Sequence, residues 1–115
     1  MAEELSRRWQ LTRWRFTNSG TESTLGAIRI ARGLTGRSDI LKIFGSYHGH
    51  HDGVMVSVGV EPGPMGPGDA SPSLPYGDGV PPSTVDGVHA LHFNDATAME
   101  RASGSSRVWG ESRRA

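Results

Sequence analysis

Residues 15–44, RFTNSGTESTLGAIRIARGLTGRSDILKIF, decide the fold class of this chain. Residues 13–17 alternate basic and bulky side chains, which is the period-two pattern of a strand. Residues 18–36 have helical periodicity, and residues 39–44 are apolar on both faces, as buried parallel strands are. The order strand, helix, strand, with short connections, predicts a βαβ unit and the α/β class.

The helix expected over residues 18–36 carries signals at both ends. Ser19 stands three residues before Glu22, as in a capping box, and Gly36 is placed to end the helix. We expect one apolar face to point toward a core. That face consists of Leu25, Ile28, Ala31 and Leu34.

Weaker patterns flank this unit. We expect a short helix over residues 2–10 and a strand over residues 87–93. Residues 53–60 read as an extended or short helical segment. Residues 61–83 hold all seven prolines and predict a long irregular loop rich in glycine and proline, of a length that is usually functional or disordered.

The last part of the chain is divided at residue 102. Residues 94–102 predict a helix that Asn94 caps. Residues 103–115 show no apolar period and end in charged side chains, so we expect a disordered tail. The prediction is therefore one domain over residues 1–102 followed by that tail.

Composition excludes several classes of function. The chain has 115 residues with twelve basic and twelve acidic side chains, so no overall field attracts nucleic acid or an anionic membrane. There is no cysteine, which excludes disulfides and thiolate metal sites. No stretch approaches the length of a transmembrane helix, and no apolar leader is visible, so we expect a cytoplasmic location. A packing role for Trp9 and Trp14 is favoured over base stacking.

The turn Asn18-Ser19-Gly20-Thr21 is a candidate anion site. It lies where the predicted strand meets the predicted helix, and helix N-termini present unpaired N–H groups and a positive dipole end. Gly20 permits a close backbone approach, and the hydroxyls of Ser19 and Thr21 add donors. Taken alone, the motif favours a helix cap that binds nothing.

The histidines of YHGHHD, residues 47–52, raise the question of a metal site. On helices, His48 with His51 and His89 with His92 would each share a face. Residues 87–93 read as a strand, however, where positions three apart face opposite ways, and the spacing matches no usual zinc pattern. Hydrogen-bonded or surface imidazoles are the favoured interpretation, and a metal-binding module is the less favoured alternative.

Three motifs in order carry a resemblance to a known family. NSGTE, then RxARxxTGR, then KxxGxYHGH resemble the cofactor-binding stretch of class III pyridoxal-phosphate-dependent aminotransferases, near the branch containing glutamate-1-semialdehyde aminomutase. PYGDGVP and FND resemble the family's next segment, so that the resemblance covers most of residues 3–102. It implies part of the large domain of fold type I.

The resemblance assigns roles to five residues. In this family the SGT turn binds the phosphate of pyridoxal 5'-phosphate, which implies Gly20 and Thr21 as donors with Ser19 beside them. The tyrosine of YHGH stacks on the pyridine ring, which implies Tyr47 in that role and His48 next to it. It implies no metal and, in this chain, no catalytic residue.

Two departures from the family pattern bear on activity. Phe44 stands where the family often has an acidic residue. Lys42 is the sole lysine, and it lies inside a predicted strand. In the family the lysine that forms the Schiff base and the aspartate under the ring nitrogen lie far downstream. We therefore expect a truncated piece of the large domain that is inactive by itself.

The family also implies partners. Intact members act on a small-molecule amino donor and acceptor and form homodimers. Nucleic acid and membrane are not expected. The alternative to a broken aminotransferase is a non-catalytic fragment that docks on a full-length relative through its exposed sheet edge and loop.

Overall fold

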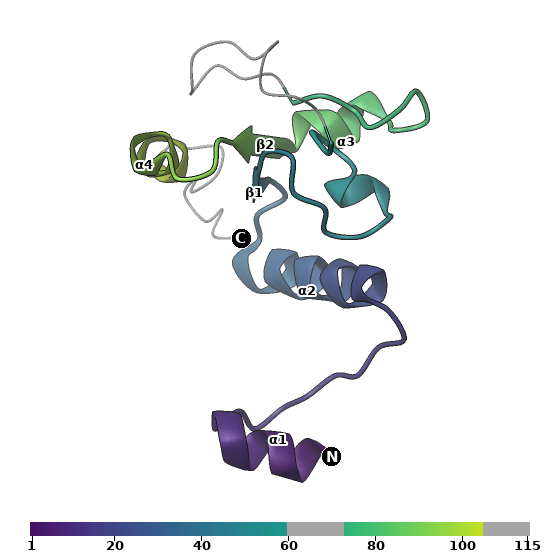
Figure 1. The fold of residues 1–115 in the computed structure, drawn as a ribbon, viewed down its shortest axis with the longest axis vertical. Helices are drawn as coiled ribbons and strands as arrows, with labels where there is room; N and C mark the ends of the chain where they lie inside the picture. The colour runs from purple at the N-terminus through teal and green to yellow at the C-terminus, as the bar shows by residue number, and fades with distance from the viewer. Residues whose placement is uncertain (60–72, 105–115) are drawn as a thin grey trace.

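The computed structural model describes residues 1–59 and 73–104. Within these ranges the elements are α1 (Ala2–Trp9), α2 (Gly20–Thr35), β1 (Ile40–Ile43), the 3-10 helix η1 (Asp52–Val54), α3 (Pro82–Asp86), β2 (Val88–Leu91) and α4 (Ala96–Gly104). Figure 1 shows α1 set apart from the other elements at the end of an extended segment. Among the described residues, no helix is both long enough and apolar enough to cross a membrane.

The described sheet pairs β1 with β2 in parallel. Ile40 lies opposite Val88, and Ile43 lies opposite Leu91. This confirms the predicted α/β class and the strands predicted over residues 39–44 and 87–93. Each observed strand is shorter than the range predicted for it. Parallel strands need a crossover connection, and here the connection runs through the histidines, the proline-rich stretch and α3.

The strand predicted over residues 13–17 is wrong. These residues run as an extended segment but pair with neither β1 nor β2 in the described ranges (Figure 1). An alternation of basic and bulky side chains favours extended backbone, but a strand also needs a neighbour that accepts its hydrogen bonds. The partner of β1 comes from later in the chain instead.

Helix α2 begins and ends as its caps predict. Ser19 has extended backbone and accepts the Glu22 N–H, while Gly36 adopts a left-handed conformation with φ of 66°. The predicted apolar face is covered only in part: Leu25 and Ile28 are half-buried, but Leu34 is 83% exposed. No residue of α2 is fully buried.

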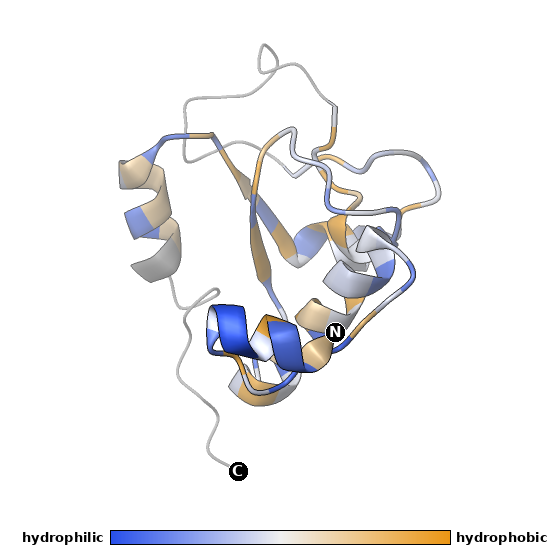
Figure 2. Cartoon of the chain, turned by 60° about the horizontal axis from the view of Figure 1, so that its bottom comes forward, coloured by the Kyte–Doolittle hydropathy of each residue, from blue (hydrophilic) through white to orange (hydrophobic). Residues whose placement is uncertain are grey.

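The core lies around β2 and the segment after the histidines. Figure 2 shows apolar residues along both strands, while α1 is hydrophilic. The buried apolar side chains are Val54, Met55, Val56, Val88, Ala90, Leu91 and Ala98. This core is small because the apolar face of α2 contributes few buried atoms to it.

Ser57 connects three distant segments inside that core. It is fully buried with φ of 52°, and its carbonyl accepts the Gly45 N–H at 2.8 Å. Its N–H donates to the Leu74 carbonyl at 2.6 Å, and its hydroxyl accepts the Leu74 N–H. Residues 53–59 were expected to be either extended or helical, and they contain both conformations. The 3-10 helix η1 ends at Val54, and isolated β-bridges follow at Val56 and Val58.

The C-terminal helix differs from its prediction at its start. The Asp95 carboxylate accepts the Ala98 N–H at 2.8 Å, so Asp95 caps α4 and the predicted Asn94 cap is wrong. Asn94 instead adopts a left-handed conformation with φ of 62°, which asparagine tolerates. The helix continues to Gly104, two residues into the predicted tail.

The predicted proline-rich loop is only partly described. Its C-terminal end is shorter than expected because α3 begins at Pro82, a favourable first position for a helix. Residues 60–72 and 105–115, which hold the rest of that loop and most of the predicted tail, lie outside the described residues.

Candidate functional site

The turn before α2 presents backbone donors. The Ser19 hydroxyl accepts the Glu22 N–H at 3.2 Å, and the Glu22 carboxylate accepts the Asn18 N–H at 2.7 Å. Within the described part of the chain, the N–H groups of Gly20 and Thr21 have no hydrogen-bond acceptor. Both groups stand at the positive end of a 16-residue helix, which attracts an anion.

The space over this turn is open. A Cβ built on Gly20 would meet no atom within 4 Å in the described structure. An anion could therefore approach the backbone at Gly20 closely, which a side chain would hinder. The residues present fit a phosphate group: two free N–H donors, a helix dipole and no crowding side chain.

A second segment lies against the same turn. We call residues 46–51, SYHGHH, the histidine loop. The His50 N–H donates to the Thr21 Oγ1 at 3.0 Å, and the Thr24 hydroxyl donates to the His48 carbonyl at 2.6 Å. Gly49, which lies between His48 and His50, is buried and has a φ of 114°. A Cβ at Gly49 would lie 2.8 Å from the Thr21 Cα. The loop is therefore seated directly on the first turn of α2.

This contact brings the five sequence-predicted site residues into one region. Ser19, Gly20 and Thr21 form the turn, and Tyr47 and His48 precede the glycine that touches it. Tyr47 is 60% exposed, so its side chain is accessible to a ligand.

The histidines are dispersed among separate partners. His48 bonds the Ser46 hydroxyl at 3.0 Å, and His51 lies 3.4 Å from the Thr24 hydroxyl. His89 pairs with Asp39 at 2.9 Å, while His92 stacks on Phe44. Among the described residues, no three histidine or carboxylate side chains gather closely enough to hold a metal ion.

His51 has a perturbed acidity. Burial lowers the pKa of its imidazole, and the charges of Arg29 and Arg32 lower it further, while the Asp52 carboxylate acts in the opposite direction. The neutral imidazole is therefore favoured at this position against the side of α2.

Lys42 lies on the predicted buried strand and is 6% exposed. Its ammonium donates to the carbonyls of Ser46, Val54 and Val56 at 2.9, 3.2 and 2.6 Å. Burial lowers the pKa of this ammonium. The sequence predicted the buried strand, but it gave no sign of which carbonyls the lysine would meet.

Gly49 and Thr24 were not among the site residues predicted from the sequence. Gly49 makes the closest approach between the histidine loop and α2, and Thr24 holds that loop from one turn further along the helix. A glycine between two histidines was a signal for a positive φ or a close backbone approach. Thr24 had no comparable signal, because its role depends on a contact between distant segments.

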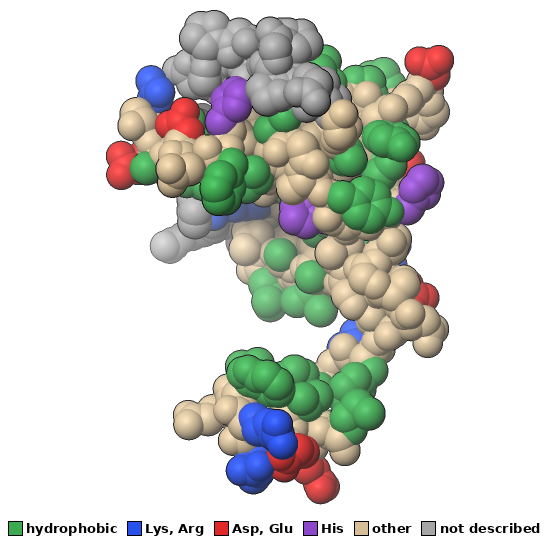
Figure 3. All heavy atoms as spheres, in the orientation of Figure 1, with side chains coloured by type: hydrophobic (Ala, Val, Ile, Leu, Met, Phe, Trp, Pro, Cys, Tyr) green, Lys and Arg blue, Asp and Glu red, His purple; other side chains and the backbone are tan. Residues whose placement is uncertain are grey.

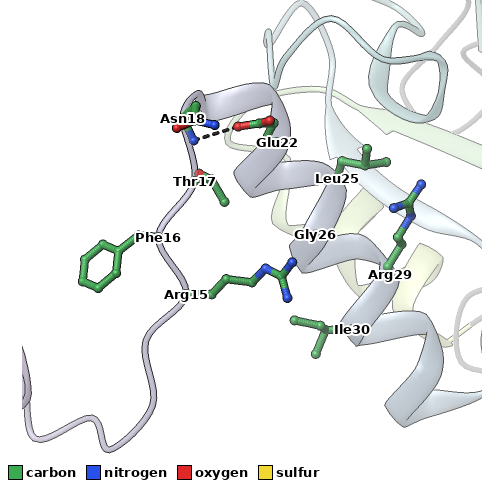
Figure 4. A pocket seen from close by; sticks show the side chains of 9 residues that line it. All are labelled: Arg15, Phe16, Thr17, Asn18, Glu22, Leu25, Gly26, Arg29 and Ile30. Carbon is green, nitrogen blue, oxygen red and sulfur yellow. Dashed lines mark hydrogen bonds between the residues drawn. The ribbon is translucent and has the colours of Figure 1, made fainter. Parts of the chain in front are cut away.

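A groove lies beside this site on the outer side of α2. Its volume is about 580 Å³, and Figure 4 shows Arg15 reaching toward the helix while Phe16 points away from it. Its lining residues are Arg15, Phe16, Thr17, Asn18, Glu22, Leu25, Gly26, Arg29 and Ile30. The groove does not include Gly20, Thr21 or Tyr47, so it is separate from the candidate phosphate turn.

Known proteins resemble this chain closely over a limited length. Glutamate-1-semialdehyde 2,1-aminomutase 1 of Macrococcus caseolyticus is 42% identical over 88 residues, which are 76% of this chain and 19% of that protein. The glutamate-1-semialdehyde 2,1-aminomutase of Aquifex aeolicus is 43% identical over the same shares. This chain thus spans about a fifth of the length of these relatives. No protein-family model matches it.

Solved structures give the same result. An omega-transaminase from Sphaerobacter thermophilus matches 89% of this chain and 23% of its own, with a TM-score of 0.78 and 40% identity. A glutamate-1-semialdehyde aminomutase from Pseudomonas aeruginosa, solved in complex with PMP, matches 93% of this chain and 22% of its own, with a TM-score of 0.70 and 29% identity. Over the matched stretch, this chain therefore matches class III aminotransferases, both glutamate-1-semialdehyde aminomutases and an omega-transaminase.

Proposed function

We propose that this chain carries the phosphate- and ring-binding part of a pyridoxal 5'-phosphate site of the fold type I large domain. Ser19, Gly20 and Thr21 would bind the phosphate, Tyr47 would stack on the ring, and His48 would lie beside it. The observation that supports this most is the seating of the histidine loop on the first turn of α2, next to the two free N–H groups.

Each of these groups has a defined task. The N–H groups of Gly20 and Thr21 donate to phosphate oxygens, and the dipole of α2 stabilises the negative charge. The Thr21 hydroxyl accepts the His50 N–H, so its own proton is available to a phosphate oxygen. The exposed ring of Tyr47 offers an apolar face to a flat heterocycle. When bound, the cofactor supplies an electron sink for carbanions.

We further propose that this chain supplies no catalytic amine. Nucleophilic attack on a carbonyl needs a neutral and accessible amine. Lys42, the sole lysine, is buried, and its ammonium donates to three carbonyls. For an assembled enzyme, we propose a small-molecule amino donor and acceptor and a homodimer, as the family resemblance implies.

The experiment is a titration followed by amide NMR. Inorganic phosphate and pyridoxal 5'-phosphate should both shift the amides of Gly20, Thr21 and Glu22, while Tyr47 should respond to the aromatic cofactor alone. Borohydride treatment should trap no stoichiometric adduct on Lys42.

A matched pair of variants tests the turn itself. Gly20→Val should abolish the response because a branched side chain crowds the anion. Gly33→Val, also at an open position of α2, should retain it. Shifts centred on Arg37, or a trapped adduct on Lys42 at low cofactor concentration, would contradict the proposal.

A second candidate function is docking on a full-length relative. It is favoured by the exposed apolar surfaces of α2 and the N-terminal segment, where Ile30, Leu34 and Phe16 are 56%, 83% and 57% exposed. Figure 3 shows hydrophobic side chains on both sides of the separation between α1 and the main body. Such surfaces attract an apolar partner.

Co-purification with an intact glutamate-1-semialdehyde aminomutase tests this function. Leu34→Glu should weaken the complex, and Arg13→Glu, a change at an exposed polar position, should not. Equal binding by both variants would exclude this face of α2 as the docking surface.

A further inference from the structure

Lys42 occupies a position that the proposed cofactor site does not use. Its ammonium has three N–H donors and meets three carbonyl acceptors, so each donor has one partner. A lysine is rarely buried unless it is paired. The described structure gives it no carboxylate partner, and main-chain carbonyls alone stabilise its charge.

The three acceptors lie at both ends of the histidine loop. Ser46 is the first residue of that loop, and its carbonyl belongs to the peptide unit that also contains the Tyr47 N–H. Val54 and Val56 lie beyond its last residue, His51: Val54 ends η1, and Val56 lies in the buried segment that follows η1. Because Lys42 lies in β1, its ammonium links this strand to the start of the loop and to the segment that follows the loop.

The remaining supports of the loop act elsewhere. The Gly45 N–H donates to the Ser57 carbonyl, and the His50 N–H donates to Thr21. These bonds fix the base of the loop and its contact with α2. The N–H and hydroxyl of Ser46 donate to the Ile43 carbonyl, while the Ser46 carbonyl has Lys42 as its donor, so Lys42 holds the side of Ser46 that leads into Tyr47.

We infer that Lys42 is a positioning residue, whose ammonium clamps the two ends of the histidine loop and so holds Tyr47 beside the N-terminus of α2. The role of Tyr47 in this inference rests on the proposed function. The clamp itself does not, because it concerns bonds within the chain. A buried amine that resembles a catalytic lysine thus acts through its three hydrogen bonds and not as a nucleophile.

The experiment is amide hydrogen exchange on the full chain without ligand. Lys42→Met retains the length of the side chain and removes its donors. We expect the His50 amide to exchange about tenfold faster in this variant, because its bond to Thr21 depends on the loop geometry. The amides of Ile40 and Phe44, which donate to Gly87 and Leu91 across the sheet, should change by less than about twofold.

Two comparison variants separate charge from position. Lys42→Arg retains a cation with donors and should keep His50 exchange within about threefold of wild type. Arg13→Met removes one exposed charge and should leave all these amides unchanged.

Three results would overturn the clamp. One is unchanged His50 exchange in a folded Lys42→Met chain. Another is an equal rise at Ile40 and Phe44, which would make Lys42 a general core residue. The third is a Lys42→Arg chain that exchanges at His50 as fast as Lys42→Met.

A pyridoxal phosphate titration of the same variants separates this inference from the proposed function. No wild-type response at Gly20 and Thr21 would refute the cofactor site and leave the exchange result to decide the clamp. If the wild-type amides of Gly20 and Thr21 respond, and the Tyr47 shift is the same in Lys42→Met as in wild type, the cofactor site stands. That result would refute only the role of Lys42 in positioning Tyr47.

Discussion

At the scale of the residue, Gly49 is the closest contact between the histidine loop and α2. Its φ of 114° is unfavourable for any side chain, and the neighbouring Thr21 backbone leaves no room for a Cβ. The positive φ and the close Thr21 backbone both disfavour any residue other than glycine at position 49. The site therefore depends on a glycine that itself binds nothing.

Gly49→Ala should lower the free energy of unfolding by about 2–4 kcal/mol, because backbone strain and a clash with Thr21 add. Gly36→Ala is the matched control: φ there is 66°, but a Cβ would meet nothing within 4 Å. We expect that change to cost about 1 kcal/mol. Urea unfolding measures both, and equal losses would show that the Thr21 contact contributes little.

His51 gives the chain a dependence on pH. Its pKa is lowered in the folded chain from the ordinary value of 6.5, so the unfolded chain binds more protons just below that value. The free energy of unfolding should therefore fall as pH falls through this window, and become constant once the folded imidazole is also protonated.

Urea midpoints measured between about pH 7 and about pH 5 test this dependence. His51→Gln should reduce the slope, whereas His50→Gln, at an exposed position, should retain it. A slope that is the same in wild type and His51→Gln would assign the pH dependence to other groups.

At the scale of the element, the N-terminus of α2 combines a structural cap with the proposed anion site. Ser19→Ala removes the acceptor for the Glu22 N–H and should cost about 1 kcal/mol of stability. Ser19→Asp retains an acceptor and should keep that stability. Its charge beside Gly20 and Thr21 should nevertheless weaken phosphate binding by at least about tenfold.

Urea unfolding and phosphate titration of the same two variants separate the cap from the site. Undiminished phosphate binding by Ser19→Asp would place the anion elsewhere.

The elements also show which information is local. The caps of α2 were predictable because Ser19, Glu22 and Gly36 act within one or two turns. The apolar runs predicted both strands, yet the partner of β1 was expected at residues 13–17 and lies at Val88–Leu91. Strand pairing depends on contacts between distant segments, which periodicity does not encode. The same limit concealed the Thr24 contact to His48 and the three acceptors of Lys42.

At the scale of the whole molecule, α1 and the residues after it form a nearly independent lobe (Figure 3). Trp9 and Trp14 pack edge to face at 6.2 Å, and the Trp14 indole N–H donates to the Ser6 hydroxyl. The Glu4 carboxylate pairs with Arg7 and Arg8 on the exposed side of the helix. These contacts all stay within the N-terminal segment, and α1 contains no buried residue.

Deletion of residues 1–14 should therefore change the free energy of unfolding by less than about 0.5 kcal/mol. Ala98→Asp is the positive control, because it places an unpaired carboxylate at a buried position of α4 and should destabilise strongly. Urea unfolding followed by circular dichroism compares the two. A large loss on deletion would show that the lobe packs on the main body in solution.

The parallel pairing of β1 with β2 has a consequence for the order of folding. Ile40 meets Val88 only after the histidine loop, the proline-rich stretch and α3 have closed into one long loop. Closing such a loop must precede the contacts that stabilise it, whereas α2 needs only its own residues. We expect α2 to acquire protected amides early in refolding and the sheet to acquire them last. Because doubling a loop adds only about 0.6 kcal/mol of closure entropy, the proline-rich connection can vary in length at little thermodynamic cost.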